Sequence, residues 1–180
     1  MIKCTLNVRG ESDFAKMDEA NDKLQSDLLA IVGGDVSDKE LLDYANTLVA
    51  RIRKEIGHEG DNFWCVAEVV DGMPGDARVD LIYRPTYLAT CILMQAWLRL
   101  KELRESESFK SALQGAMYGS MGRHFEGHGF DWYEGLCETL HIFELGRVPE
   151  FLEAYPDLNS DFTNLYREAV AFHNERQSNS

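Results

Sequence analysis

Residues 119–132 bring together the side chains of this chain that are best suited to chemistry. Interleaved with four glycines, this stretch holds five polar candidates: Arg123, His124, Glu126, His128 and Asp131. Imidazole and carboxylate groups can coordinate zinc or iron, and a glycine-rich backbone can present N–H groups to an anion that an arginine also binds. We therefore predict a ligand-binding loop here, in which His124 and His128 are also candidate metal ligands.

The spacing of these two histidines does not match an established metal motif. They lie four residues apart, but glutamate does not follow His124, so the sequence lacks HExxH. A helix would place both imidazoles on one face, and Gly127 and Gly129 disfavour a helix. An alternative without a ligand stays open, in which the histidines and Arg123 bond backbone carbonyls in a tight interhelical turn.

A polar stripe follows this loop along the next predicted helix. Glu134, Glu138 and His141 are spaced at i, i+4 and i+7, which places them within about 60° of one another on a helix. The stripe either extends a pocket formed by the loop or is an ordinary solvated face. We include these three residues among the candidate ligand-binding residues.

Arg84 is a candidate from a different part of the chain. It precedes Pro85 and has Tyr83 and Tyr87 as close neighbours in the sequence. A guanidinium in this setting can bind an anion or stack on an aromatic ring. The alternative is that Arg84 neutralises Asp80, which would be a structural role.

The spacing E-x-x-H occurs twice, at Glu138–His141 and at Glu55–His58. Di-iron carboxylate bundles use two such motifs together with one inward glutamate from each of two further helices. The most apolar predicted helix, over 86–98, contains no glutamate, and Gly57 puts His58 at or beyond a helix end. The pattern therefore does not predict a di-metal centre.

Apolar periodicity predicts the elements that must position these residues. It favours a mainly α-helical fold, a compact bundle of about six or seven helices in a single globular domain over 1–180. Residues 87–98 are apolar on nearly all sides, so we expect a central helix that opens at Pro85 and runs to about Glu105. Further helices are predicted at about 13–32, 38–57, 108–118, 132–145, 149–155 and from 160 onward.

Three stretches have the composition of short β-strands, at residues 2–8, 63–70 and 78–83. The first alternates apolar and polar side chains, and the other two flank the turn-forming sequence DGMPGD. A small β-hairpin or short sheet is therefore compatible with the helical bundle. A short helix followed by a loop stays open as the alternative for 62–83.

Two local signals define the junction between the first two predicted helices. Gly33 and Gly34 end the first helix, because glycine adopts the left-handed conformation common at helix C-termini. Ser37 followed three residues later by Glu40 matches a capping box at the start of the second helix. A sharp turn between two well-defined helices is expected here.

The chain is strongly acidic, with a net charge of −13. Residues 11–43 contain ten acidic residues against three lysines, and residues 124–180 contain eleven against three arginines. Such flanks repel the phosphates of nucleic acids and the anionic lipids of membranes, so we predict no direct binding to either. This charge suits a basic protein partner, and a small-molecule ligand is also possible. The alternative is that the acidic surface only keeps the protein soluble.

Four cysteines, at positions 4, 65, 91 and 137, are dispersed without CxxC spacing among apolar neighbours. This predicts buried free thiols in a reducing compartment. No apolar run reaches the roughly 18 residues of a membrane-spanning helix, and the N-terminus lacks the apolar core of a secretory signal, so we expect a cytoplasmic protein. The sequence contains no Walker loop, dinucleotide fingerprint or nucleophile elbow, so we predict that no cofactor is bound. It does not indicate the oligomeric state.

Two functional hypotheses follow from the sequence. The first is a non-catalytic binding or regulatory module with a polar site at residues 119–132. The second is an enzyme in which His124, His128 or His141, with Glu126 or Glu138, acts as an acid–base group or metal ligand, because imidazole titrates near neutral pH. Elemental analysis of the purified protein discriminates between them, since a stoichiometric transition metal would favour the enzyme.

Overall fold

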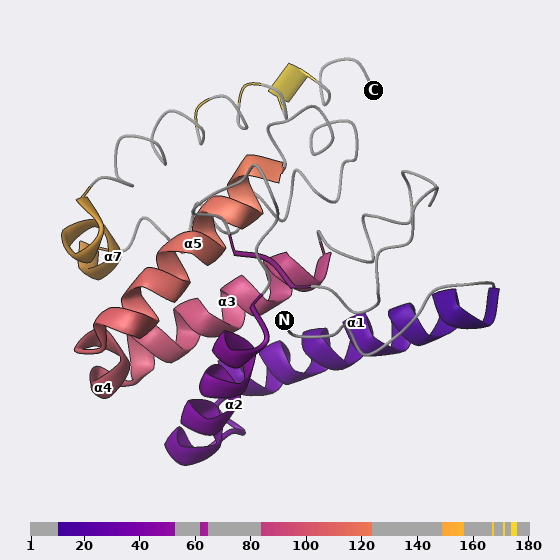
Figure 1. Cartoon of the computed structure of the whole chain (residues 1–180), viewed down its shortest axis with the longest axis horizontal. Coiled ribbons are helices and arrows are strands. Elements are labelled where there is room, and N and C mark those ends of the chain that lie inside the picture. Colours follow the sequence, from indigo (N-terminus) through magenta and orange to yellow (C-terminus); the bar gives the residue numbers. More distant parts are fainter. Residues whose placement is uncertain are drawn as a thin grey trace. The chain divides into compact units, whose positions relative to one another are not determined.

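The computed structural model describes residues 11–52, 62–64, 84–123 and 149–156, with single helical residues at 167, 171, 174 and 175. The chain divides into two compact units, Met1–Ser120 and Met121–Ser180, and each is described by itself. The described residues contain six helices, drawn in colour in Figure 1. The predicted mainly α-helical fold is therefore confirmed.

Helix α1 (Glu11–Gly33) ends where the two glycines predict it to end. The Gly34 N–H donates to the carbonyl of Ile31 at 3.2 Å, and the Asp35 N–H donates to the carbonyl of Ala30 at 2.9 Å. These two bonds form a Schellman motif, which satisfies carbonyls that the end of the helix leaves without partners. Gly34 adopts the left-handed conformation that the motif requires, with φ of 85°.

Replacing Gly34 with alanine is expected to lower the free energy of unfolding by about 1 kcal/mol, because a β-carbon disfavours the left-handed backbone. No described atom lies within 4 Å of a β-carbon built on Gly34, so the cost is conformational and not steric. Gly34→Asn should lose less, since asparagine tolerates this conformation better than alanine. Urea unfolding of both variants measures the order, and equal stability of all three proteins would contradict the prediction.

Helix α2 (Asp38–Ala50) begins at the predicted capping box. The Ser37 hydroxyl oxygen accepts the Glu40 N–H at 3.3 Å, and the Glu40 carboxylate accepts the Ser37 N–H at 2.9 Å. This reciprocal pair satisfies two backbone donors of the first turn. The inward face of α2 carries the buried residues Leu41, Ala45 and Leu48.

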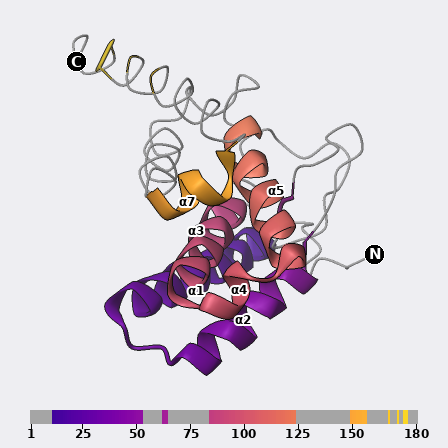
Figure 2. The same cartoon turned by 90° about the vertical axis from the view of Figure 1, so that its left-hand side faces the viewer.

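Helix α3 (Arg84–Arg99) is the central element of the first unit, as its apolar sequence predicts. Eleven of its residues are buried, and it packs against both α1 and α2 (Figures 1 and 2). The Arg84 guanidinium donates to Gln25 of α1 at 2.9 Å, and the Arg99 guanidinium donates to Asp38 at 2.7 Å. These contacts at its two ends show that α3 runs in the same direction as α1.

The helix predicted to run from Pro85 to about Glu105 is interrupted at Leu100, which corrects the sequence interpretation. Leu100 has an extended backbone, with φ of −108° and ψ of 108°, and its side chain is buried. The single-turn helix α4 (Lys101–Arg104) follows directly. Leucine is a good helix former, so the break is imposed by tertiary structure and not by local preference.

The arginine at the end of α4 stabilises this break. A break at Leu100 removes the i+4 donors for the carbonyls of the last turn of α3. The Arg104 guanidinium supplies donors in their place, to the carbonyl of Trp97 at 3.0 Å and to that of Leu98. It also lies over the Trp97 ring, 5.6 Å from the ring centroid, which adds a cation–π contact.

Helix α5 (Glu107–Arg123) passes through the first part of the predicted loop. The prediction that the helix ends near Gly119 is therefore wrong for residues 119–123, which are helical. The hydroxyl of Thr90 in α3 contacts α5 at two places, the carbonyl of Ala116 at 3.3 Å and the Ser120 hydroxyl at 2.8 Å. All five residues predicted to face inward are buried: Phe109, Ala112, Leu113, Ala116 and Met117.

Residues 62–64 cross α5 at close range. The backbone N–H of Asn62 donates to the carbonyl of Gly115, and its side-chain Nδ2 donates to the carbonyl of Ala112, both at 2.8 Å. A β-carbon built on Gly119 would lie only 2.1 Å from the Asn62 carbonyl oxygen. Gly119 therefore permits a close approach of two backbones inside a helix, which explains a glycine that the sequence alone assigns to a loop.

Within the described residues, α2 ends at Ala50, before the predicted end near Gly57. In a continuing helix the carbonyl of Leu48 would accept the N–H of Ile52. This carbonyl instead accepts the backbone N–H of Arg51 at 3.0 Å and the indole N–H of Trp64 at 2.9 Å. The end of α2 is thus tied to a residue that lies distant in the sequence.

In the second unit, the described helix α7 (Pro149–Ala154) agrees with the predicted helix at 149–155. Phe151 and Tyr155 are buried, and their rings stack with centroids 6.1 Å apart. Among the residues that the structure describes, no helix is both long and apolar enough to cross a bilayer.

Several sequence predictions lie outside the described residues. Of the three predicted β-stretches, only residues 63 and 64 are described, and Phe63 forms a single β-bridge. The predicted helix at 132–145 is not described, and the helix from 160 onward is represented only by single residues. Of the four cysteines, Cys91 is described, and it is buried and outside any disulfide, as predicted.

Candidate functional site

Most of the residues predicted to form a site lie outside the described part of the chain. Of the nine candidates, Arg84 is described with its side chain, and Arg123 is described as the last residue of α5. Arg84 contacts Gln25 of α1, whereas its possible partner Asp80 lies outside the described residues. The other seven candidates also lie outside the described residues, so their roles stay predictions: His124, Glu126, His128, Asp131, Glu134, Glu138 and His141.

The two E-x-x-H motifs, at Glu55–His58 and Glu138–His141, also lie outside the described residues. Among the residues that are described, no group of three or more histidine, cysteine, aspartate or glutamate side chains is arranged to hold a metal ion. Neither observation tests the metal prediction for His124 and His128.

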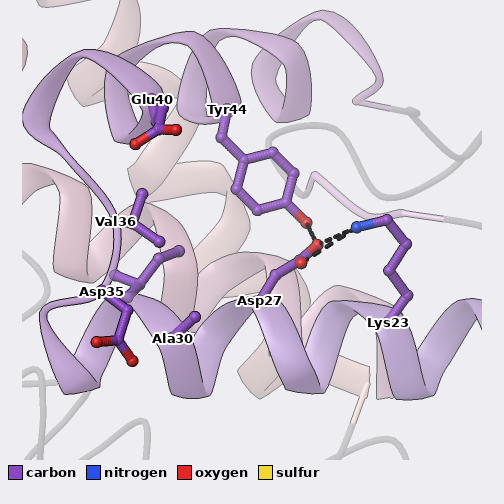
Figure 3. A pocket seen from close by; sticks show the side chains of 8 residues that line it. Lys23, Asp27, Ala30, Asp35, Val36, Glu40 and Tyr44 are labelled. Atoms are coloured by element: carbon purple, nitrogen blue, oxygen red, sulfur yellow. Dashed lines mark hydrogen bonds and ion pairs between the residues drawn. The ribbon is translucent and has the colours of Figure 1, made fainter.

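The structure shows a pocket that the sequence does not predict, between α1 and α2. We call it the α1–α2 pocket, and its volume is about 280 Å³. Figure 3 shows α1 below, the turn at one side and α2 above. The lining consists of three carboxylates, one ammonium, one phenol and three aliphatic side chains: Asp27, Asp35, Glu40, Lys23, Tyr44, Ala30, Ile31 and Val36.

Helical spacing explains why these residues share one pocket. Lys23, Asp27, Ala30 and Ile31 follow one another at steps of four, three and one along α1, so they lie on one face. Glu40 and Tyr44 of α2 are four residues apart and also share a face. The short Schellman turn brings these two faces together and contributes the remaining lining residues.

Asp27 lies at the centre of the polar contacts in this pocket. Its carboxylate accepts bonds from the Lys23 ammonium at 2.8 and 3.1 Å and from the Tyr44 hydroxyl at 2.8 Å. Burial raises the pKa of Tyr44, and the hydrogen bond to Asp27 raises that pKa further. The phenol therefore keeps its proton at neutral pH and remains a donor to the carboxylate.

Glu40 has a structural role as well as a position in the pocket. Besides the backbone N–H, the Ser37 hydroxyl donates to its carboxylate at 2.5 Å, and these bonds lower the pKa of Glu40. A carboxylate with a lowered pKa stays ionised at neutral pH, and its contribution to stability is lost only as the pH falls through that pKa. Glu40 therefore supplies a negative charge to the pocket at neutral pH.

Asp35 differs from the other two carboxylates of the pocket. Its backbone N–H is used in the turn, but within the described part of the chain no donor bonds its exposed carboxylate. With Asp27 and Glu40 it gives three negative charges against the single positive charge of Lys23. The pocket therefore has a net charge of −2, the difference between those charges, and chemistry suited to a cationic ligand.

The sequence contains part of the signal for this pocket. The acidic composition of 11–43 marks the right region, and the capping signals mark the turn. The hydrogen bond between Tyr44 and Asp27 joins residues 17 positions apart, however, and depends on how two helices cross. Tyr44 is expected from its spacing to face inward, and the structure leaves it half-buried at the edge of the pocket.

Comparisons of the chain with protein-family models, with curated proteins and with solved structures find no match.

Proposed function

We propose that this chain is a non-catalytic binding module for a basic polypeptide, whose cationic side chain enters the α1–α2 pocket. The single observation that carries this proposal is the makeup of the pocket, in which three carboxylates and one ammonium surround an aliphatic lining. Charged side chains and apolar surface at one position are suited to recognition of an amphipathic group. Nothing in this arrangement requires a chemical step.

The shape of a lysine or arginine side chain matches this lining. Both residues carry their charge at the end of an alkyl stem, which packs against apolar surface while the charged end stays near polar groups. The Tyr44 ring and the aliphatic residues Ala30, Ile31 and Val36 are available to the stem. The Asp35 carboxylate, which no described donor bonds, is available to the charged end.

The backbone of α1 adds to the attraction for a cation. The C-terminus of a helix carries partial negative charge, and a cation near it is stabilised by about 0.3–1 kcal/mol. The last turn of α1 contains no basic residue of its own. The surrounding sequence is also acidic, since residues 11–43 hold ten acidic residues against three lysines, and this charge steers a basic partner toward the pocket.

Removing one carboxylate from the pocket is expected to weaken binding of a hexalysine peptide. Asp35→Asn and Asp27→Asn should each reduce the affinity about fivefold, which corresponds to about 1 kcal/mol for a partly screened ion pair. Isothermal titration calorimetry at low salt measures the loss. Added salt should weaken the wild-type complex, because exposed charges are screened within about 10 Å at 0.1 M.

Asp22→Asn is the matched control for these variants. Asp22 is exposed on the same helix, but it does not line the pocket, so its loss should change the affinity less than about twofold. A loss at Asp22 as large as the loss at Asp35 would show that net charge alone attracts the peptide. That result would overturn the assignment of the pocket as the binding site.

A further inference from the structure

One group in the α1–α2 pocket is already a cation bound to a carboxylate. The Lys23 ammonium contacts both oxygens of Asp27, at 2.8 and 3.1 Å, and Figure 3 shows it on one side of that carboxylate with the Tyr44 phenol on the other. The structure therefore shows that Asp27 pairs with an ammonium on an unbranched alkyl stem. The ligand in this case belongs to the chain itself.

We infer that Lys23 is an internal competitor for the pocket, and that a partner's lysine ammonium binds Asp27 by displacing it. This inference rests on the proposed function, because it names both the group recognised and the contact that regulates recognition. The class of ligand is a primary alkylammonium, carried by a lysine of a polypeptide or by a free diamine.

The two members of the ion pair differ in their contact with solvent. The Lys23 side chain is 74% exposed, whereas the Asp27 side chain is 27% exposed. Asp27 is also held by Tyr44, which comes from the other helix. The carboxylate is thus a fixed part of the pocket wall, and the ammonium reaches it from the solvent side.

Displacement of Lys23 has a small cost. An exposed pair at i, i+4 on a helix shifts an equilibrium only about twofold, because the released ammonium is well solvated. After the exchange, Asp27 is again paired with an ammonium and still accepts the bond from Tyr44. The incoming group gains the contacts of its stem with Ala30, Ile31 and Val36, which give it an advantage over Lys23.

The test compares two lysine variants that change the net charge equally. Lys23→Met removes the competitor, and Lys39→Met removes a lysine that is exposed and adjacent in sequence to Glu40 but does not line the pocket. Calorimetric titration with a hexalysine peptide should show about threefold tighter binding for Lys23→Met, of which about twofold comes from the lost competition, and a gain below about 1.5-fold for Lys39→Met. Both lysines are exposed, so both variants should keep the wild-type circular dichroism spectrum.

A double variant separates competition from a general change in charge. If Lys23 acts by covering Asp27, then Lys23→Met should bring no gain beyond that of Lys39→Met when Asp27→Asn is also present. A second series of titrations with 1,5-diaminopentane identifies the source of the ammonium. If Lys23→Met gains more affinity than Lys39→Met for the diamine, the ligand is a free amine. If it gains more affinity for the peptide alone, the ligand is a polypeptide. Either result supports the inference.

The negative outcomes distinguish the two proposals. If wild type and both lysine variants fail to bind peptide and diamine, the proposed function is overturned together with this inference. If wild type binds and loses affinity in Asp35→Asn, but Lys23→Met and Lys39→Met gain equally, only the role of Lys23 is overturned.

Discussion

Gly119→Ala is expected to lower the free energy of unfolding by about 3 kcal/mol or more, the upper range for overpacking a tight contact. The added β-carbon would lie 2.1 Å from the carbonyl oxygen of Asn62 and 3.0 Å from its carbonyl carbon. These are backbone atoms, so no rotamer change can relieve the clash. Residues 62–64 would have to move from α5, which would break the bonds from Asn62 to Gly115 and Ala112.

Gly33→Ala provides the matched control for this substitution. Gly33 is also a glycine within a helix, at the end of α1. The nearest atom to its added β-carbon, however, is a carboxylate oxygen of Asp35, at 3.3 Å. That exposed side chain can rotate, so the stability should change by less than about 1 kcal/mol. Urea unfolding of both variants gives the comparison. Equal stabilities of the two would show that the contact between Gly119 and Asn62 does not hold the fold.

Leu93→Ala is expected to lower the free energy of unfolding by about 2–5 kcal/mol, the range for removing a fully buried leucine side chain. Leu93 is 0% exposed and lies in the middle of α3, the helix that packs against both α1 and α2. The cavity left behind cannot be filled by solvent without exposing apolar surface. Thermal and urea unfolding should both show the loss.

A leucine-to-alanine substitution at an exposed position is the matched control. It shows whether the loss of stability comes from the burial of Leu93. Leu29 in α1 is 66% exposed, so Leu29→Ala should change the free energy of unfolding by less than about 0.5 kcal/mol. If Leu29→Ala were as destabilising as Leu93→Ala, the exposed face of α1 would be buried in the folded protein, and the assignment of α3 as the centre of this unit would be wrong.

The sequence predicts those parts of the fold that depend on neighbouring residues. Gly34 and the Ser37–Glu40 pair mark the ends of α1 and α2 because a cap is formed by residues within one turn of the helix end. The central position of α3 is predicted because burial on all sides requires apolar residues on all sides.

Errors occur where packing contacts, and not the local preferences of the residues, decide the structure. Leu100 breaks a helix whose composition favours continuation, and Arg104 then bonds the carbonyls left at its end. The carbonyl of Leu48 accepts the indole of Trp64, a partner 16 positions away in the sequence. Gly119 resembles a loop residue in sequence, but its lack of a side chain serves a contact inside a helix.

The α1–α2 pocket could be predicted only in part for the same reason. An acidic segment and a turn are visible in the sequence, whereas the junction of Asp27, Lys23 and Tyr44 depends on the crossing of two helices. The prediction for residues 123–141 relies instead on the unusual density of histidine, glycine and acidic residues. Composition of that kind indicates where to look, but it does not specify which atoms meet.

The short turn after α1 makes the pocket a local feature of the chain. All the lining of the pocket comes from the continuous stretch 23–44, and Ile31 is its one buried member, since the other lining residues are exposed or half-buried. The connection between the two helices is short, so little chain entropy is lost in closing it. Substitutions at the exposed and half-buried lining positions can therefore change the charge of the pocket while the buried residues of α3 stay unaltered.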